Sequence, residues 1–193
     1  MLLKTKHYIC KLDKFLKKLA KSFKYWIFIF CLISLRFQQP SNYDTNAKIK
    51  AVFLYNFTRY FEWSDKKKTG NFVIYVVGKN DNLITELKTL SGKKKVGNQD
   101  IEIKNSFAFD AAIQAQIIYL LPDVSKAIAD VSSKSKSKGT LVVAESPNAC
   151  KTGSSINFVI VENKLKFEYN KTNAVKAGLK TNDDFKALAI NVE

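Results

Sequence analysis

Three short apolar runs, separated by segments with a helical pattern, constrain the fold of this chain more than any other feature. The runs are 71–78 (NFVIYVVG), 117–122 (IIYLLP) and 140–145 (TLVVAE). Each is nearly continuous in β-branched and aliphatic residues, as expected for strands that are covered on both faces. Strands that alternate with helices favour a parallel sheet. The sequence therefore predicts an α/β fold with a mainly parallel central sheet and helices on both faces.

The segments between and around these strands read as helices, one further strand and loops. In 80–90, four leucine and isoleucine residues share one helical stripe, and Asn80 or Asp81 is placed to cap its N-terminus. The other expected elements are helices at 46–62, 108–116, 123–131, 171–177 and 182–191, a strand at 100–106, a basic turn at 92–99 and a low-complexity loop at 132–139.

The C-terminal part predicts a different strand arrangement. Residues 156–170 (INFVIVENKLKFEYN) alternate apolar and polar residues on both sides of Glu162 and Asn163. This pattern is typical of an antiparallel hairpin with a two-residue turn. Gly178 stands where a C′ cap would end the helix at 171–177. Because no repeat and no long linker divides the body, we expect a single domain with this hairpin at its C-terminal end.

The N-terminal segment carries much of the positive charge. The chain has a formal net charge of +15, and residues 1–37 hold nine of its 32 lysine and arginine residues but one of its 17 acidic residues. The apolar run 25–35 is shorter than a relaxed membrane span, which needs about 20 residues, and suits a secretory signal. We therefore expect a basic leader with a signal peptide or uncleaved signal anchor at 1–37, a short linker at 38–46 and the α/β domain at 47–193.

This leader predicts a periplasmic or otherwise extracytoplasmic location. An uncleaved leader would be the one part of the chain that anchors it to the membrane.

Cysteine and histidine content limits the chemistry that the body can perform. Cys10 and Cys31 lie in the leader, so the body holds the single thiol of Cys150 and no internal disulfide. Cys150 is either a buried small hydrophobic residue or an exposed thiol able to pair between chains. The one histidine, His7, also lies in the leader, and no glycine-rich phosphate loop is present. We predict no enzyme, no catalytic or metal-binding residues and no cofactor.

Lysine clusters at 66–68, 93–95 and within 132–139 raise the question of nucleic-acid binding. Loop lysines of an exported protein are more simply interpreted as solvated surface. We therefore expect no nucleic-acid partner.

Residues 48–63 (KIKAVFLYNFTRYFEW) concentrate the aromatic residues of the body. On a helix, Lys50, Thr58 and Glu62 lie on the side opposite an apolar stripe. That stripe consists of Ile49, Val52, Phe53, Asn56, Phe57, Tyr60 and Phe61. A base-stacking surface needs basic residues among the aromatics, and the stripe has none, so we expect most of it to face the sheet. Asn56 interrupts the stripe and is either a structural clamp on a nearby backbone or a ligand contact.

The same stretch resembles the opening motif of the YfiR family. The resemblance continues in order through FVIYVVG, LSGKKKVGNQDIEI, IIYLLP and 140–189 (TLVVAESPNACKTGSSINFVIVENKLKFEYNKTNAVKAGLKTNDDFKALA), and it spans 47–191. Ser64 departs from the family, which usually has proline at this position. The motif residues, which we expect to define the fold, are Phe53, Leu54, Tyr55, Asn56, Phe57, Phe61, Trp63, Gly153, Asn157, Asn170, Gly178 and Leu179.

The resemblance implies an exported regulatory protein without known catalysis. The implied partner is the outer sensor region of a membrane signalling protein, a diguanylate cyclase or a histidine kinase, whose output the regulator restrains. Control of cyclic-di-GMP signalling and biofilm formation, and a homodimer, are further implications. The alternative is an extracytoplasmic sensor domain that binds a small ligand in a pocket near Asn56.

Overall fold

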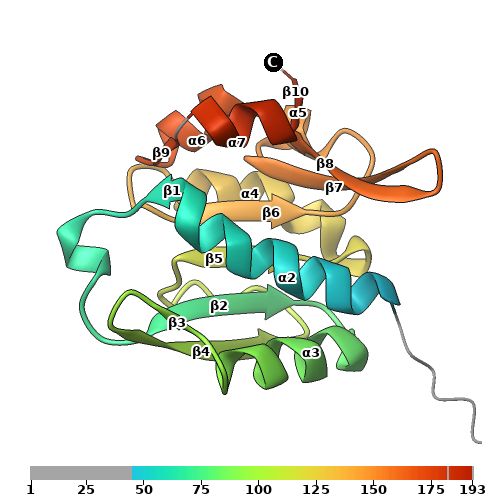
Figure 1. The fold of residues 1–193 in the computed structure, drawn as a ribbon. Helices are drawn as coiled ribbons and strands as arrows, with labels where there is room; N and C mark the ends of the chain where they lie inside the picture. The colour runs from blue at the N-terminus through green and yellow to red at the C-terminus, as the bar shows by residue number, and fades with distance from the viewer. Residues whose placement is uncertain (1–44, 182, 193) are drawn as a thin grey trace, which may run out of the picture. The chain divides into compact units, whose positions relative to one another are not determined.

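An eight-stranded sheet forms the centre of the molecule in the computed structural model, which describes residues 45–181 and 183–192. Its strands follow the order β10-β8-β7-β6-β5-β2-β4-β3 (Figure 1). They are β2 (Phe72–Val77), β3 (Lys95–Val96), β4 (Gln99–Ser106), β5 (Ile117–Leu120), β6 (Leu141–Ala144), β7 (Ile156–Val161), β8 (Lys164–Tyr169) and β10 (Ile190–Asn191).

Most neighbouring strands of this sheet are parallel. The pairs from β4 through β2, β5 and β6 to β7 are parallel, and β10 is parallel to β8. The β3–β4 and β7–β8 pairs are antiparallel. Glu162 and Asn163 connect β7 to β8 with φ angles of 51° and 58°, as a two-residue hairpin turn requires. The predicted fold class, including the C-terminal hairpin, is confirmed.

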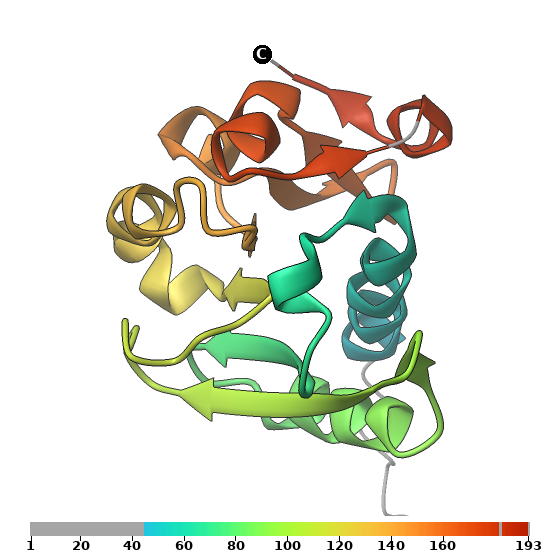
Figure 2. The ribbon, with the colours of Figure 1, turned by 90° about the vertical axis from the view of Figure 1, so that its left-hand side faces the viewer.

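Helices cover both faces of the sheet. Figure 2 shows α2 on one side of the sheet and α4 on the other. The helices are α2 (Thr45–Tyr60), α3 (Asp81–Ser91), α4 (Ile128–Lys134), α5 (Ala149–Thr152), α6 (Lys171–Lys176) and α7 (Asp183–Leu188), with 3-10 turns η1 (Asp65–Lys67) and η2 (Pro122–Ala127). A separate two-stranded sheet pairs β1 (Phe61–Glu62) with β9 (Lys180–Thr181).

The continuous apolar run in β2 follows from this two-sided covering. Phe72, Ile74 and Val76 belong to the core that contains α2 and α3. The alternate residues Val73, Tyr75 and Val77 belong to a second core with α4 and α5. Because successive side chains of a strand point to opposite faces, a sheet packed on both faces leaves no position for an exposed polar residue.

The prediction of a helix at 108–116 is wrong, because this segment is an irregular loop with a turn at 111–112 and bends at its two ends. Its alanine-rich composition favours a helix, but local and tertiary hydrogen bonds prevail. The Asp110 carboxylate accepts from the amide of Ala112 at 2.8 Å, and the amide of Asp110 donates to the Tyr75 hydroxyl at 2.9 Å. A side chain that bonds the backbone two residues ahead forms a turn instead of a helix.

Several element boundaries also differ from expectation. Helix α2 ends at Tyr60, and the next two residues form β1. The expected loop 132–139 begins inside α4, and the expected helix 182–191 ends at Leu188 because Ile190–Asn191 pair with the edge of β8. The backbone groups of Ile190 and Asn191 find hydrogen-bond partners on the open edge of β8, in place of the partners that another helical turn would provide. The predicted cap of α3 is confirmed, since Asn80 accepts from the Leu83 amide at 2.9 Å.

Candidate functional site

The face of α2 that packs on the sheet differs from the predicted stripe. The buried positions of this helix are Ala47, Lys50, Ala51, Leu54, Phe57 and Thr58. Ile49 and Val52, which we expected in the core, are 37% and 43% exposed. The two alanines leave room for close contact with the sheet. The helix is therefore rotated relative to the prediction, and its side chains at Phe53, Asn56 and Tyr60 are only partly covered.

Lys50 and Thr58 lie on the buried face, so their predicted exposed positions are wrong. Both residues are tolerated there because each has a partner. The Thr58 hydroxyl donates to the Tyr55 carbonyl at 2.6 Å. The Lys50 ammonium donates to both carboxylate oxygens of Glu145, and the Tyr119 hydroxyl donates to one of them at 2.6 Å.

Sequence reasoning missed this network of Lys50, Glu145 and Tyr119. Burial and the neighbouring Glu145 carboxylate raise the pKa of Tyr119, so its hydroxyl stays a donor. One signal was available in the sequence: Lys50 stands between Ala47 and Ala51 at the spacing of one helical face.

The partly covered side of α2 forms one wall of a groove. Its cavity has a volume of about 240 Å³. We name it the α2 groove, lined by Phe53, Asn56, Phe57 and Tyr60 of α2, Leu165, Lys166 and Phe167 of β8, and Phe185 and Leu188 of α7. Segments that are more than 100 positions apart in sequence thus build a single apolar hollow.

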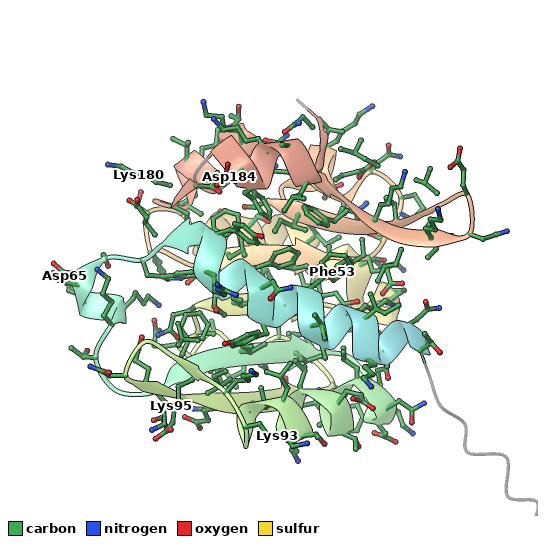
Figure 3. The ribbon with its side chains drawn as sticks, viewed as in Figure 1. Phe53, Asp65, Lys93, Lys95, Lys180 and Asp184 are labelled. Atoms are coloured by element: carbon green, nitrogen blue, oxygen red, sulfur yellow. The ribbon has the colours of Figure 1, made fainter. Side chains whose placement is uncertain are left out.

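Aromatic rings form the base of the α2 groove. The ring centroid of Phe57 lies 5.3 Å from that of Phe167 and 5.8 Å from that of Phe185. The Phe53 ring lies above them, 5.5 Å from Phe167, on the side of α2 that faces the β7–β8 hairpin (Figure 3). Such edge-to-face ring contacts hold the base of the groove in a defined shape.

Exposed apolar residues extend the α2 groove. Ile49 and Val52 precede Phe53 on the outer side of α2, and Leu188 on its far wall is 60% exposed. Ile160 of β7 pairs with groove residue Leu165 and is 58% exposed. Exposed apolar residues beside an apolar hollow are characteristic of a surface that binds another molecule.

Comparison with known proteins identifies the family of this chain. The sequence profile of the YfiR/HmsC-like family matches residues 47–189, from the first turn of α2 to the residue before β10. The chain belongs to the YfiR/HmsC-like family. This confirms the resemblance found in the sequence. No curated protein matches the chain. The YfiR/HmsC-like family is periplasmic and regulatory, not catalytic.

Asn56, a residue of the YfiR motif, lies on the wall of the α2 groove. Its side-chain amide forms no hydrogen bond with any other residue among those that the structure describes, 45–181 and 183–192. The alternative that Asn56 clamps a nearby backbone is therefore wrong for this part of the chain. Contact with a ligand is the alternative that its position allows.

The other aromatic and aliphatic motif residues lie in the core behind the α2 groove. Leu54, Phe61, Trp63 and Leu179 are buried there. Tyr55 is partly buried, and its hydroxyl lies 3.5 Å from the Lys95 carbonyl.

The remaining motif residues shape the backbone near the hairpin. Gly153 and Gly178 have φ angles of 133° and 83°, which side chains disfavour. Asn157 accepts from the Ser146 amide and donates to Glu168, at 3.0 and 2.9 Å.

Cys150 is buried, so the alternative of an exposed thiol that pairs between chains is wrong. Burial raises the pKa of the Cys150 thiol to about 11. Its neutral thiol contacts the Ser154 hydroxyl at 3.8 Å, and it serves as a small core residue.

Within the described residues, no group of three or more histidine, cysteine, aspartate or glutamate side chains could hold a metal ion. In the same residues, no helix has both the length and the apolar character needed to cross a membrane. The apolar run 25–35 of the leader lies outside the described residues.

Proposed function

We propose that this protein is an exported regulator that binds the extracytoplasmic sensor region of a membrane signalling protein and restrains its output. The signalling protein is a diguanylate cyclase or a histidine kinase. The observation that carries the proposal is the α2 groove with its exposed apolar rim. Membership of a periplasmic regulatory family supports this class of function.

The chemistry of the α2 groove suits a protein partner. Ile49, Val52 and Leu188 present apolar surface that a bound partner would remove from water. The α2 groove, with a cavity of about 240 Å³, has room for one inserted aliphatic or aromatic side chain, as in the central pocket of many interfaces. The regulator would act by occupancy, because a partner held on this surface cannot rearrange for signalling.

Export and assembly form part of the same proposal. We infer a basic leader at 1–37 that directs secretion or remains as a signal anchor, a linker at 38–46 and a YfiR-like domain at 47–193. We also propose a homodimer.

Deletion and complementation test the proposal. Deleting the gene should raise intracellular cyclic-di-GMP and surface adhesion if the partner is a cyclase, and the wild-type gene should restore both. Val52→Glu places a charge on the rim and should fail to restore them. The control Asn82→Glu introduces the same charge on exposed α3, away from the groove, and should restore both.

Two outcomes would contradict parts of the proposal. If Val52→Glu is present at wild-type level and restores the phenotype fully, the α2 groove is not the contact surface. If deletion changes neither cyclic-di-GMP nor adhesion, the cyclase version is wrong, and phosphorylation of a histidine kinase in the deletion strain then decides whether the partner is a kinase.

A second candidate function is a small-ligand sensor. The observation that favours it is the side-chain amide of Asn56, which lines the α2 groove of about 240 Å³ and has no hydrogen-bond partner among the described residues. A thermal-shift screen with nucleotides, amino acids and vitamins tests it. A compound that stabilises the wild type but not Asn56→Leu supports the sensor, and a flat response to every compound argues for protein partners.

A further inference from the structure

A second cavity, of about 270 Å³, lies between α4, α5 and α6, outside the α2 groove. Its lining is polar, with serine, threonine and asparagine side chains, and contains no aspartate or glutamate. We name it the α4–α6 cavity. Of the family-motif residues, Gly153 lines it, and the proposed function does not use it.

Three lysines from three different segments surround the α4–α6 cavity. Lys136 follows α4, Lys151 belongs to α5 and Lys176 ends α6. All three are exposed, and none forms an ion pair with an acidic residue in the described part of the chain. Three cations around a small polar hollow create a positive potential that attracts an anion.

The hydroxyl of Ser132 gives an independent indication of a ligand. Its oxygen is buried on the cavity wall and has no hydrogen-bond partner among the described residues. Buried polar groups in folded proteins almost always have a partner, because an unpaired one destabilises the fold. A turn of the Ser132 side chain about χ1, from Gly153 toward the cavity, would bring this hydroxyl to an oxygen atom of a bound molecule, which would accept the hydrogen bond.

The surrounding backbone holds this wall in place. Gly153 has a φ angle of 133°, and a Cβ atom at this residue would lie 2.9 Å from the Ser132 hydroxyl. The Asn173 side chain donates to the carbonyls of Cys150 and Ser154 at 2.7 and 2.9 Å, which ties α6 to α5. The lysines on these two helices are therefore presented by a pre-organised frame.

We propose that the α4–α6 cavity binds a phosphate group. The Ser132 hydroxyl donates to one phosphate oxygen, and the ammonium groups of Lys136, Lys151 and Lys176 neutralise the charge. A phosphate monoester carries a charge of roughly −1.5 to −2 near pH 7 and three acceptor oxygens, which matches this set of donors better than a single carboxylate does. The phosphate belongs either to a small soluble molecule or to a lipid headgroup.

Calorimetry with the full-length chain tests the site. The probes are inorganic phosphate, glycerol 3-phosphate, and vesicles of phosphatidylcholine with and without phosphatidic acid, whose headgroup is a phosphate monoester. The variant Lys151→Gln/Lys176→Gln should weaken binding by about tenfold or more, because it removes two charge-assisted hydrogen bonds. The control Lys93→Gln/Lys94→Gln removes the same charge near β3, at the opposite end of the sheet from β10 (Figure 3 labels Lys93), and should bind like the wild type.

Ser132→Ala separates ligand binding from folding. This variant should lose affinity for the probe and yet unfold at the same temperature as the wild type or higher, since the removed hydroxyl has no partner in the folded protein. Lower affinity together with wild-type stability is a result that a purely structural serine would not produce.

Each outcome bears on the proposal. Binding of inorganic phosphate or glycerol 3-phosphate that the cavity variants lose supports a soluble ligand. Binding of phosphatidic acid vesicles alone, lost in the cavity variants and kept in the Lys93/Lys94 control, supports a headgroup. The leader is present in every variant and does not affect the comparison. Absence of binding to all probes, or equal losses in the cavity and control variants, overturns the proposal.

Discussion

The ammonium nitrogen of Lys50 lies 2.8 and 2.7 Å from the two carboxylate oxygens of Glu145, a residue 95 positions away in sequence. The two side chains are 10% and 25% exposed. Glu145 directly follows β6, so this ion pair joins α2 to the carboxyl end of a central strand. It also sets the rotation of α2, because Lys50 can reach Glu145 only when Ile49 and Val52 point outward.

Removal of one member of this pair should destabilise the protein strongly. Lys50→Met leaves the Glu145 carboxylate largely buried without its cation, and we expect a loss of about 3 kcal/mol. The double variant Lys50→Met/Glu145→Gln removes both charges and keeps an acceptor for Tyr119, so it should recover most of that loss. Urea unfolding measures both. Equal losses of unfolding free energy in the single and double variants would show that the ion pair contributes little to stability.

An exposed ion pair provides the comparison. Lys134 and Asp130 form a pair at i,i+4 on the surface of α4. Lys134→Gln should change the free energy of unfolding by less than about 1 kcal/mol.

The rotation of α2 predicts which of its apolar residues carry stability. Phe57→Ala creates a cavity beneath the α2 groove and should cost about 3–5 kcal/mol. Val52→Ala, on the exposed side, should change the free energy of unfolding by less than about 0.5 kcal/mol. Thermal or urea unfolding distinguishes the two. A large loss of unfolding free energy with Val52→Ala would show that Val52 is buried in the core, as the apolar stripe in the sequence predicted.

Asn170 should stabilise α6 as its N-cap. Its side-chain oxygen accepts from the Asn173 amide at 2.9 Å. Asn170→Ala should therefore cost about 1 kcal/mol, whereas Asn170→Ser keeps an acceptor and should retain most of the stability. Similar losses with alanine and serine would indicate that packing around the buried Asn170, and not the cap, is responsible.

The raised pKa of the Cys150 thiol predicts that the folded protein loses stability at high pH. Burial raises the pKa of its thiol from 9.0 to about 11 in the folded protein. Unfolding therefore releases a proton between these two pH values, and stability that is fully present below pH 9 falls as the pH rises toward 11. Unfolding measured across this range should show a steeper loss for the wild type than for Cys150→Ala. Identical slopes would contradict the prediction.

The same burial should make the Cys150 thiol react slowly. A thiol reagent at pH 8 should modify Cys150, followed by peptide mapping apart from Cys10 and Cys31, far more slowly in the folded protein than in the unfolded chain, because attack requires an accessible thiolate. Equal rates in the two states would show that the thiol is accessible.

Local sequence patterns were sufficient for the described strands of four or more residues and for the hairpin turn, but not for the two-residue strands β1, β3, β9 and β10. Continuous β-branched runs predicted β2, β5 and β6, and the alternation around Glu162 and Asn163 predicted the hairpin. The helix predicted at 108–116 failed because the amide of Asp110 bonds the Tyr75 hydroxyl, a partner that lies 35 positions away. Propensity describes a segment in isolation, and such a contact outweighs it.

The sequence by itself determined the fold class and the family, because both depend on the order and period of residues along the chain. Only the tertiary structure decided which side of α2 is buried, where Asn56 points and that the α4–α6 cavity exists. These features depend on partners that folding brings together from distant segments: Glu145 for Lys50, Phe167 and Phe185 for Phe57, and Lys151 and Lys176 beside Ser132. A helix of apolar residues on several sides has more than one face that could be buried, and contacts with the sheet select the one that satisfies its polar groups.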